Sequence, residues 1–168
     1  RQIGETCRLH LGSTDADAEK RALAMLEAVK IRDPDRVYDL YPHQLSGGMG
    51  QRVMIAMMLV AEPDLLIADE PTSALDVTVQ NEVLRILDDL VRGRGMGLIF
   101  ISHNLTIVSS FCDRVLVMYG GRIMEECKAG ELSRARHPYT RALLAAAPSL
   151  DVARPELATV TRDPAWLA

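Results

Sequence analysis

The sequence has no lysine followed by serine or threonine anywhere in its 168 residues. A glycine-rich loop of the form G-x-x-x-x-G-K-[ST], which cradles nucleotide phosphates, needs that pair. The lysines are followed by other residue types: Lys20 by Arg21, Lys30 by Ile31 and Lys128 by Ala129. The sequence therefore contains no such phosphate-binding loop. Together with an opening Arg1 in place of methionine, this absence leads us to expect a fragment whose upstream part is missing.

Cysteines and long apolar runs are also scarce. The three cysteines, Cys7, Cys112 and Cys127, are widely spaced, which excludes a disulfide framework and a metal-ligand cluster. We expect them to be reduced thiols. The longest apolar run, Met54 to Ala61, is far shorter than the roughly 20 residues that cross a bilayer. A membrane role is therefore expected to work through a membrane-embedded partner.

Positive charge is in short supply as well. The chain has 19 lysines and arginines against 23 acidic residues, a net charge of −4 and a pI of about 5.6. Nucleic-acid binding usually rests on phosphate neutralisation by basic side chains, so we expect no nucleic-acid partner. Because 48% of the residues are hydrophobic, the chain can bury a substantial core.

Hydrophobic periodicity and turn residues predict helices that alternate with strands. Thr14 with Asp17 resembles a capping box and opens the first predicted helix. The predicted helices cover residues 14–31, 49–61, 77–92, 105–112 and 139–147. The predicted strands cover residues 65–68, 98–102, 115–119 and, after a Gly120-Gly121 turn, 122–126. This alternation indicates an α/β fold with parallel strands, followed by a polar tail containing Pro148, Pro155 and Pro164.

An acid pair, Asp69-Glu70, follows the apolar strand 65–68 and is expected at the rim of the sheet. In phosphoryl transfer a protein mostly positions groups and stabilises charge, with a metal ion bridging phosphate oxygens. One carboxylate near the metal and one near the attacking water would meet this need. The alternative is a solvated pair at a strand end.

Three further patterns have both a chemical and a plain interpretation. Ser46-Gly47-Gly48 precedes a helix, so its N–H groups can face an anion, or it can be a simple helix cap. Ser73 to Asp76 is either an interface loop or the capped start of a helix. His103 follows a strand, where an imidazole can reach a phosphate, or it is a surface or capping residue.

In this order, the segments Leu45 to Met49, Leu65 to Asp76 and Ser102-His103 resemble the second half of an ATP-binding cassette (ABC) ATPase. The resemblance implies an α/β, P-loop NTPase-like core, present here as its C-terminal part with parallel strands flanked by helices, together with the α-helical signature subdomain. The implied division is 1–62 for the helical subdomain, 63–130 for the core and 131–168 for a C-terminal extension.

The same resemblance implies roles for individual residues in binding ATP and Mg²⁺. Glu70 is the implied general base and His103 the implied switch histidine, while Asp69 is the implied Mg²⁺ ligand, through water. The residues implied to contact nucleotide, held by the opposite subunit, or to line the subunit interface are Ser46, Gly47, Gly48, Gln51, Ser73 and Asp76. Two positions depart from the family pattern. Gly50 replaces a basic residue and weakens a helix by up to about 1 kcal/mol relative to alanine, and Asn104 replaces an acidic one.

The segments Tyr41 to Gln44, Asp76 to Gln80 and His137 to Thr140 look like the peptide and nickel importer branch. The implied function is that of an ATP-hydrolysing subunit at the cytoplasmic face of the membrane, inactive as a fragment alone. The implied partners are a second ABC ATPase subunit, identical or related, two transmembrane permease subunits and an extracytoplasmic substrate-binding protein. Residues 1–11 are expected to be a loop following the glutamine-bearing loop that touches the permease.

Two alternatives remain open at this point. One is a soluble ABC ATPase that acts on nucleic acid or ribosomes, which the acidic balance disfavours. The other is a catalytically dead fragment that docks to partners through its helical subdomain.

Overall fold

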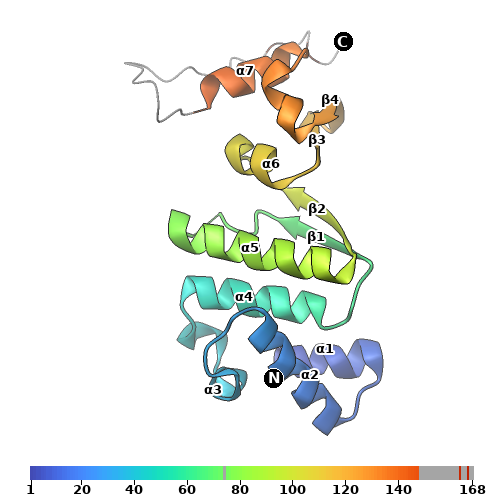
Figure 1. Ribbon diagram of the computed structural model, residues 1–168, viewed down its shortest axis with the longest axis vertical. Coiled ribbons are helices and arrows are strands. Elements are labelled where there is room, and N and C mark those ends of the chain that lie inside the picture. The colour runs from blue at the N-terminus through green and yellow to red at the C-terminus, as the bar shows by residue number, and fades with distance from the viewer. Residues whose placement is uncertain (74, 148–162, 164–165, 167–168) are drawn as a thin grey trace. The chain divides into compact units, whose positions relative to one another are not determined.

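The computed structural model describes residues 1–73, 75–147, 163 and 166. It divides into two compact units, a first unit of Arg1–Ile101 and a second unit of Ser102–Ala168 (Figure 1). Ala74 and the three prolines of the predicted polar tail lie outside the described residues. Among the described residues, no helix combines the length and the apolar composition that crossing a membrane requires.

The first unit opens with a group of helices. They are α1 (Gln2–Leu11), α2 (Asp15–Ala28), α3 (Pro34–Asp39), a short 3₁₀ turn η1 (Pro42–Gln44) and α4 (Gly47–Leu59). The predicted cap of α2 is confirmed, because the Thr14 side chain accepts a hydrogen bond from the N–H of Asp17 at 3.2 Å. The expectation of a loop over residues 1–11 is wrong. Ile3 and Cys7, four residues apart on one helical face, are both buried, and α1 packs against α2.

A strand, a helix and a second strand complete the first unit. Strands β1 (Leu65–Asp69) and β2 (Gly97–Ile101) pair in parallel, in a register from Leu65 opposite Gly97 to Asp69 opposite Ile101. Helix α5 (Val77–Arg94) connects them and lies beside α4 (Figure 1). It buries one face, formed by Val83, Leu84, Ile86, Leu87 and Val91. Gly95 ends α5 at a φ of 65°, a left-handed conformation that favours glycine.

The second unit is built around a hairpin. After α6 (Leu105–Phe111), strands β3 (Arg114–Tyr119) and β4 (Arg122–Lys128) pair antiparallel across a turn in which Gly120 and Gly121 both have positive φ. The 3₁₀ segment η2 (Ala129–Arg134) and helix α7 (Pro138–Ala146) follow. The α/β class is confirmed, but only β1 and β2 are parallel among the described strands. The boundary between the two units does not follow the three-part division, which remains a prediction.

Candidate functional site

The predicted acid pair lies at the carboxyl end of β1. Asp69 is the last residue of the strand and is exposed, whereas Glu70 is half-buried and has a φ of 47°. The Glu70 N–H donates to the carbonyl oxygen of Ile101 at 2.9 Å, and its own carbonyl accepts from the N–H of Ser73 at 3.2 Å. A non-glycine residue in the left-handed region costs on the order of 1–3 kcal/mol. Lys30, Asp33 and Glu62 have the same left-handed conformation, so it does not by itself mark Glu70 as the base.

The N-terminus of α4 is formed by the predicted signature residues. Ser46 is the N-cap, and its side chain accepts from the N–H of Met49 at 3.4 Å. The first N–H groups of a helix have no acceptor within the helix, and they carry the positive end of its dipole. Gly47 and Gly48 occupy these positions without side chains to cover them. The end of α4 therefore suits an anion, and the cap interpretation and the anion-binding one are compatible.

The loop after the acid pair leads into a tightly capped α5. The Asp76 carboxylate accepts hydrogen bonds from the N–H groups of Thr78 at 3.1 Å and Val79 at 3.0 Å. Thr72 is buried, and its hydroxyl accepts from the side-chain amide of Gln80 at 2.9 Å. Asp76 is thus a helix cap, and its predicted role in nucleotide binding is not tested by these contacts. Ser73 is exposed.

The structure brings the signature residues and the loop at 70–76 together. A Cβ atom built on Gly47 would lie 3.8 Å from Cδ2 of Leu75, and one on Gly48 would lie 2.6 Å from Cγ1 of Val79. The beginnings of α4 and α5 are therefore in direct contact. One turn further along α4, next to the half-buried Gln51, Arg52 forms an ion pair with Glu82 of α5 at 2.6 Å.

His103 belongs to the second unit, between β2 and α6, and is exposed. The next residue, Asn104, caps α6, because its side-chain oxygen accepts from the N–H groups of Thr106 at 3.1 Å and Ile107 at 3.2 Å. Its own N–H donates to the hydroxyl of Ser102 at 3.1 Å. Asn104 thus provides the cap that an acidic residue would provide at this position. The role of His103 beside the acid pair remains a prediction.

Comparison with known proteins gives consistent results. A family model described as "ABC transporter" matches residues 2–73. The oligopeptide transport ATP-binding protein OppD of Salmonella typhimurium is 46% identical over 164 residues, which cover 97% of this chain and 49% of that protein. The dipeptide transport ATP-binding protein DppD of Haemophilus influenzae is 49% identical over 148 residues, which cover 88% of this chain and 45% of that protein.

Residues 2–73 thus match the ABC transporter family, and most of the chain is similar to peptide-transport ATP-binding proteins. A solved structure agrees with this assignment: the dimeric, post-hydrolysis ATP-binding cassette MJ0796 bound to ADP and Pi is similar with a TM-score of 0.61 at 30% identity. That match covers 70% of this chain and 49% of the cassette. The chain spans about half the length of the curated relatives it matches.

ATP binding is characteristic of ABC proteins, and the residues present fit part of such a site. Among the described residues, no three histidine, cysteine or acidic side chains are grouped so that they could hold a metal ion by themselves. Mg²⁺ typically keeps several waters and is held by one or two carboxylates plus substrate phosphates. The exposed Asp69 carboxylate at the end of β1 suits that mode.

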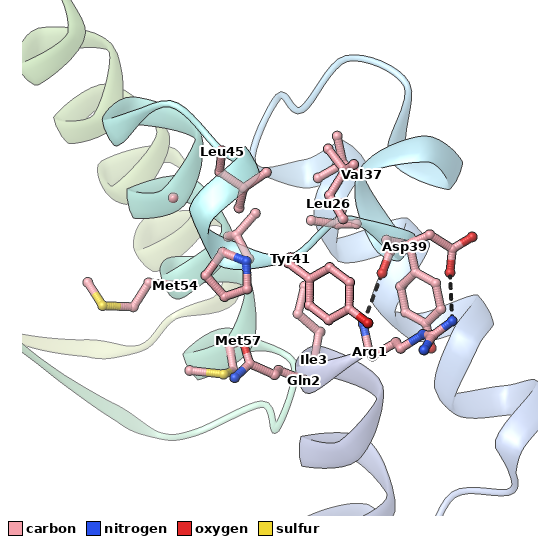
Figure 2. Close-up of a pocket in the computed structure, with 15 residues that line it drawn as sticks. Arg1, Gln2, Ile3, Leu26, Val37, Asp39, Tyr41, Leu45, Met54 and Met57 are labelled. Carbon is pink, nitrogen blue, oxygen red and sulfur yellow. Dashed lines mark hydrogen bonds and ion pairs between the residues drawn. The ribbon is translucent and has the colours of Figure 1, made fainter.

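A cavity of about 360 Å³ lies elsewhere in the first unit, among α1, α2, α3, η1 and α4 (Figure 2). Its wall is mainly apolar and includes Ile3, Leu26, Val37, Leu45, Met54 and Met57. The guanidinium of Arg1 and the carboxylate of Asp39 form an ion pair at its edge, at 3.8 Å. Tyr41 lines it as well and is 61% exposed.

Sequence reasoning missed three residues that hold the candidate site in shape, Thr72, Val79 and Glu82. Their contacts join the acid pair's loop to α5 and α5 to α4. A partial signal was available, because Val79 and Glu82 lie three residues apart on one predicted helix and so share a face. The sequence does not state which helix that face would meet.

Proposed function

We propose that this chain is part of the ATP-hydrolysing subunit of an importer for di- or oligopeptides, or for nickel complexes. The observation that carries the proposal is the contact between the open N-terminus of α4 and the loop that follows the acid pair. In this contact, the glycines that are predicted to bind phosphate lie against the loop that is predicted to line the subunit interface. The names of the oligopeptide and dipeptide relatives support the substrate class.

In the proposed mechanism, the chain contributes to two nucleotide sites. The N–H groups of Gly47 and Gly48, with the Ser46 hydroxyl, face the γ-phosphate of ATP held by a second cassette, and Gln51 lies one turn further along α4. ATP with Mg²⁺ supplies the phosphoryl group and the neutralising charge. Ser73 and the loop that ends at Asp76 lie at the interface between the two cassettes.

The remaining roles concern the carboxyl ends of the strands. Asp69 would hold Mg²⁺, and the Glu70 carboxylate would accept a proton from the attacking water. The strained conformation of Glu70 fixes the direction in which its side chain leaves the backbone. His103 contacts the γ-phosphate.

The partners in the proposed complex are two membrane-embedded permease subunits and an extracytoplasmic binding protein. The apolar cavity among α1, α3 and α4 is the proposed contact surface for a permease, at the cytoplasmic face of the membrane. Met54 is 42% exposed beside it, and methionine side chains adapt to varied apolar partners. The charged residues that line this surface, Arg1 and Asp39, pair with each other, and the mainly apolar remainder suits a protein partner better than nucleic acid.

The decisive experiment is peptide uptake in cells that express the chain within its native protein. Glu70→Gln keeps the size and the backbone conformation of the side chain but removes the proton acceptor. We expect uptake of labelled di- and oligopeptides to fall by about a hundredfold or more, as for loss of a general base.

The matched control is Glu27→Gln, which changes an exposed glutamate of α2 and should leave uptake unchanged. Normal uptake in the Glu70→Gln cells would show that Glu70 is not the base or that the protein is not an importer subunit. Copurification then separates the possibilities: polytopic membrane proteins support transport, whereas ribosomes or DNA would contradict it.

A further inference from the structure

Three glycines at the start of α4 have different surroundings, although they lie within four residues of each other. A Cβ atom on Gly48 would lie 2.6 Å from Cγ1 of Val79, a distance that real Cβ contacts do not show. On Gly47 the nearest atom would be an ordinary van der Waals neighbour at 3.8 Å, and on Gly50 nothing lies within 4 Å. The negative φ angles of a helix require glycine at none of the three. Only Gly48 is required by its packing.

Val79 has little freedom to move away from Gly48. It is β-branched and helical, so one side-chain rotamer is strongly preferred. Its N–H is held by the Asp76 carboxylate at 3.0 Å. The following residue, Gln80, is tied to the buried Thr72 at 2.9 Å. A side chain added at Gly48 must therefore push the two helices apart.

Helix α4 is held against α5 by a second contact. The guanidinium of Arg52, whose side chain is only 15% exposed, pairs with the Glu82 carboxylate at 2.6 Å. It also donates to the carbonyl oxygen of Lys30 at 3.2 Å. Displacement at Gly48 is thus expected to tilt the N-terminus of α4 about this fixed point, which moves the N–H groups of Gly47 and Gly48.

We propose that Val79 is a positioning residue: through its contact with Gly48 it sets how far the anion-binding end of α4 stands from the loop at 70–76. Gly48 is a glycine because Val79 occupies the space of a side chain. The proposal rests on the proposed function for its consequence, since a displacement of about 1 Å at a reacting phosphate costs up to about a hundredfold in rate.

The competing explanation is that Gly48 must lack a side chain to leave room for the ligand itself. The two explanations differ in one respect. If Val79 is the obstacle, shortening Val79 restores a Gly48→Ala variant. If the ligand is the obstacle, shortening Val79 restores nothing.

Thermal unfolding of the chain measures the contact without any nucleotide. We expect Gly48→Ala to lower Tm by roughly 5 °C through overpacking. Gly50→Ala, the matched control in open space, should raise Tm by about 2 °C through helix propensity. Adding Val79→Ala to Gly48→Ala should bring Tm within about 2 °C of the Val79→Ala single variant. Val79→Thr keeps both branches at Cβ and should not rescue.

Peptide uptake by the native protein in cells measures the consequence. We expect Gly48→Ala to reduce uptake by about tenfold or more, and Gly48→Ala with Val79→Ala to recover to within about threefold of Val79→Ala alone. Gly48→Ala with Val79→Thr should remain as low as Gly48→Ala. This selective rescue is a readout that general destabilisation would not produce.

Two results would overturn the proposal. One is a Gly48→Ala variant that melts like Gly50→Ala, because the contact would then be absent. The other is a double variant whose Tm recovers while its uptake does not, because the ligand would then be what requires the glycine. If the proposed function is wrong, Glu70→Gln leaves peptide uptake intact. The Tm values of the Gly48 and Val79 variants would then still decide whether Val79 positions α4.

Discussion

Helices α4 and α5 begin side by side, but their N-termini are capped in different ways. Asp76 places a carboxylate on the first N–H groups of α5, with two hydrogen bonds of 3.0 and 3.1 Å. Ser46 is neutral and caps α4 with one bond of 3.4 Å, followed by two glycines. The positive end of α5 is therefore already neutralised by its own chain, whereas that of α4 remains available for an external anion. The difference identifies which of two adjacent helices suits a phosphate.

The first test gives α4 a negatively charged N-cap like that of α5. Ser46→Asp would place a carboxylate where the proposed γ-phosphate lies. We expect peptide uptake to fall by about a hundredfold, because like charges repel at a site that must bind an anion, while stability stays within about 0.5 kcal/mol or rises. Uptake assays and urea unfolding on the same variant test this pair of expectations. Unchanged uptake would mean that no anion binds at α4.

The second test removes the carboxylate cap of α5. Asp76→Ala removes both cap bonds and should lower the free energy of unfolding by about 1–2 kcal/mol. Asp89→Ala, an exposed residue in the middle of the same helix, is the control and should change it by less than about 0.5 kcal/mol. Urea unfolding followed by circular dichroism measures both. An equal effect of the two substitutions would show that Asp76 is not an important cap.

At the N-terminal end of α7, as at that of α5, backbone N–H groups donate to a carboxylate. For α7 this carboxylate comes from another element. Glu125 of β4 accepts hydrogen bonds from the N–H groups of Arg136 at 2.6 Å and His137 at 3.3 Å. Partial burial alone would raise the pKa of Glu125, but these N–H donors, together with the Thr140 side chain and the charge of His137, outweigh it and hold the pKa below its usual range. The carboxylate therefore stabilises the fold above its unfolded-state pKa, and this contribution is lost as the pH falls through the lowered folded-state pKa.

Glu125→Gln should remove that pH dependence. We expect it to cost about 1 kcal/mol at pH 7, and progressively less as the pH falls below about 4.5, where the unfolded-state carboxylate is protonated first, and then through the lowered folded-state pKa. Thermal unfolding across this range, with Glu131→Gln as an exposed control, measures the difference. Parallel curves for wild type and Glu125→Gln would contradict the assignment.

The smallest expected effect concerns α6, which is capped by a neutral amide. Asn104→Asp keeps the cap geometry and adds a charge at the helix N-terminus, so we expect a change in unfolding free energy of no more than about 0.5 kcal/mol. Asn104→Ala should cost about 1 kcal/mol instead. Denaturant unfolding of both variants compares them, and a large loss for Asn104→Asp would mean that the amide nitrogen is needed.

Much of the local structure was predictable from short-range chemistry. The Thr14 cap of α2, the strand at 65–69 and the helix that starts after Asp76 all depend on residues within a few positions of each other. Residues 1–11 were predicted wrongly because α1 shows its helical face only through Ile3 and Cys7, which α2 covers. The antiparallel pairing of β3 and β4 is a choice of partner strand that the alternation of elements did not specify, although the glycine turn between them was visible.

The sequence by itself determined the chemical groups of the candidate site and their order: the neutral cap with its glycines, the acid pair after a strand, the loop that ends at Asp76 and the histidine. Only the tertiary structure decided which of them meet. It placed Gly48 against Val79, which lies thirty-one positions later in the chain, and Arg52 against Glu82. The physical reason is that caps and strand ends are governed by local hydrogen bonds, whereas close packing depends on which faces of distant helices come together.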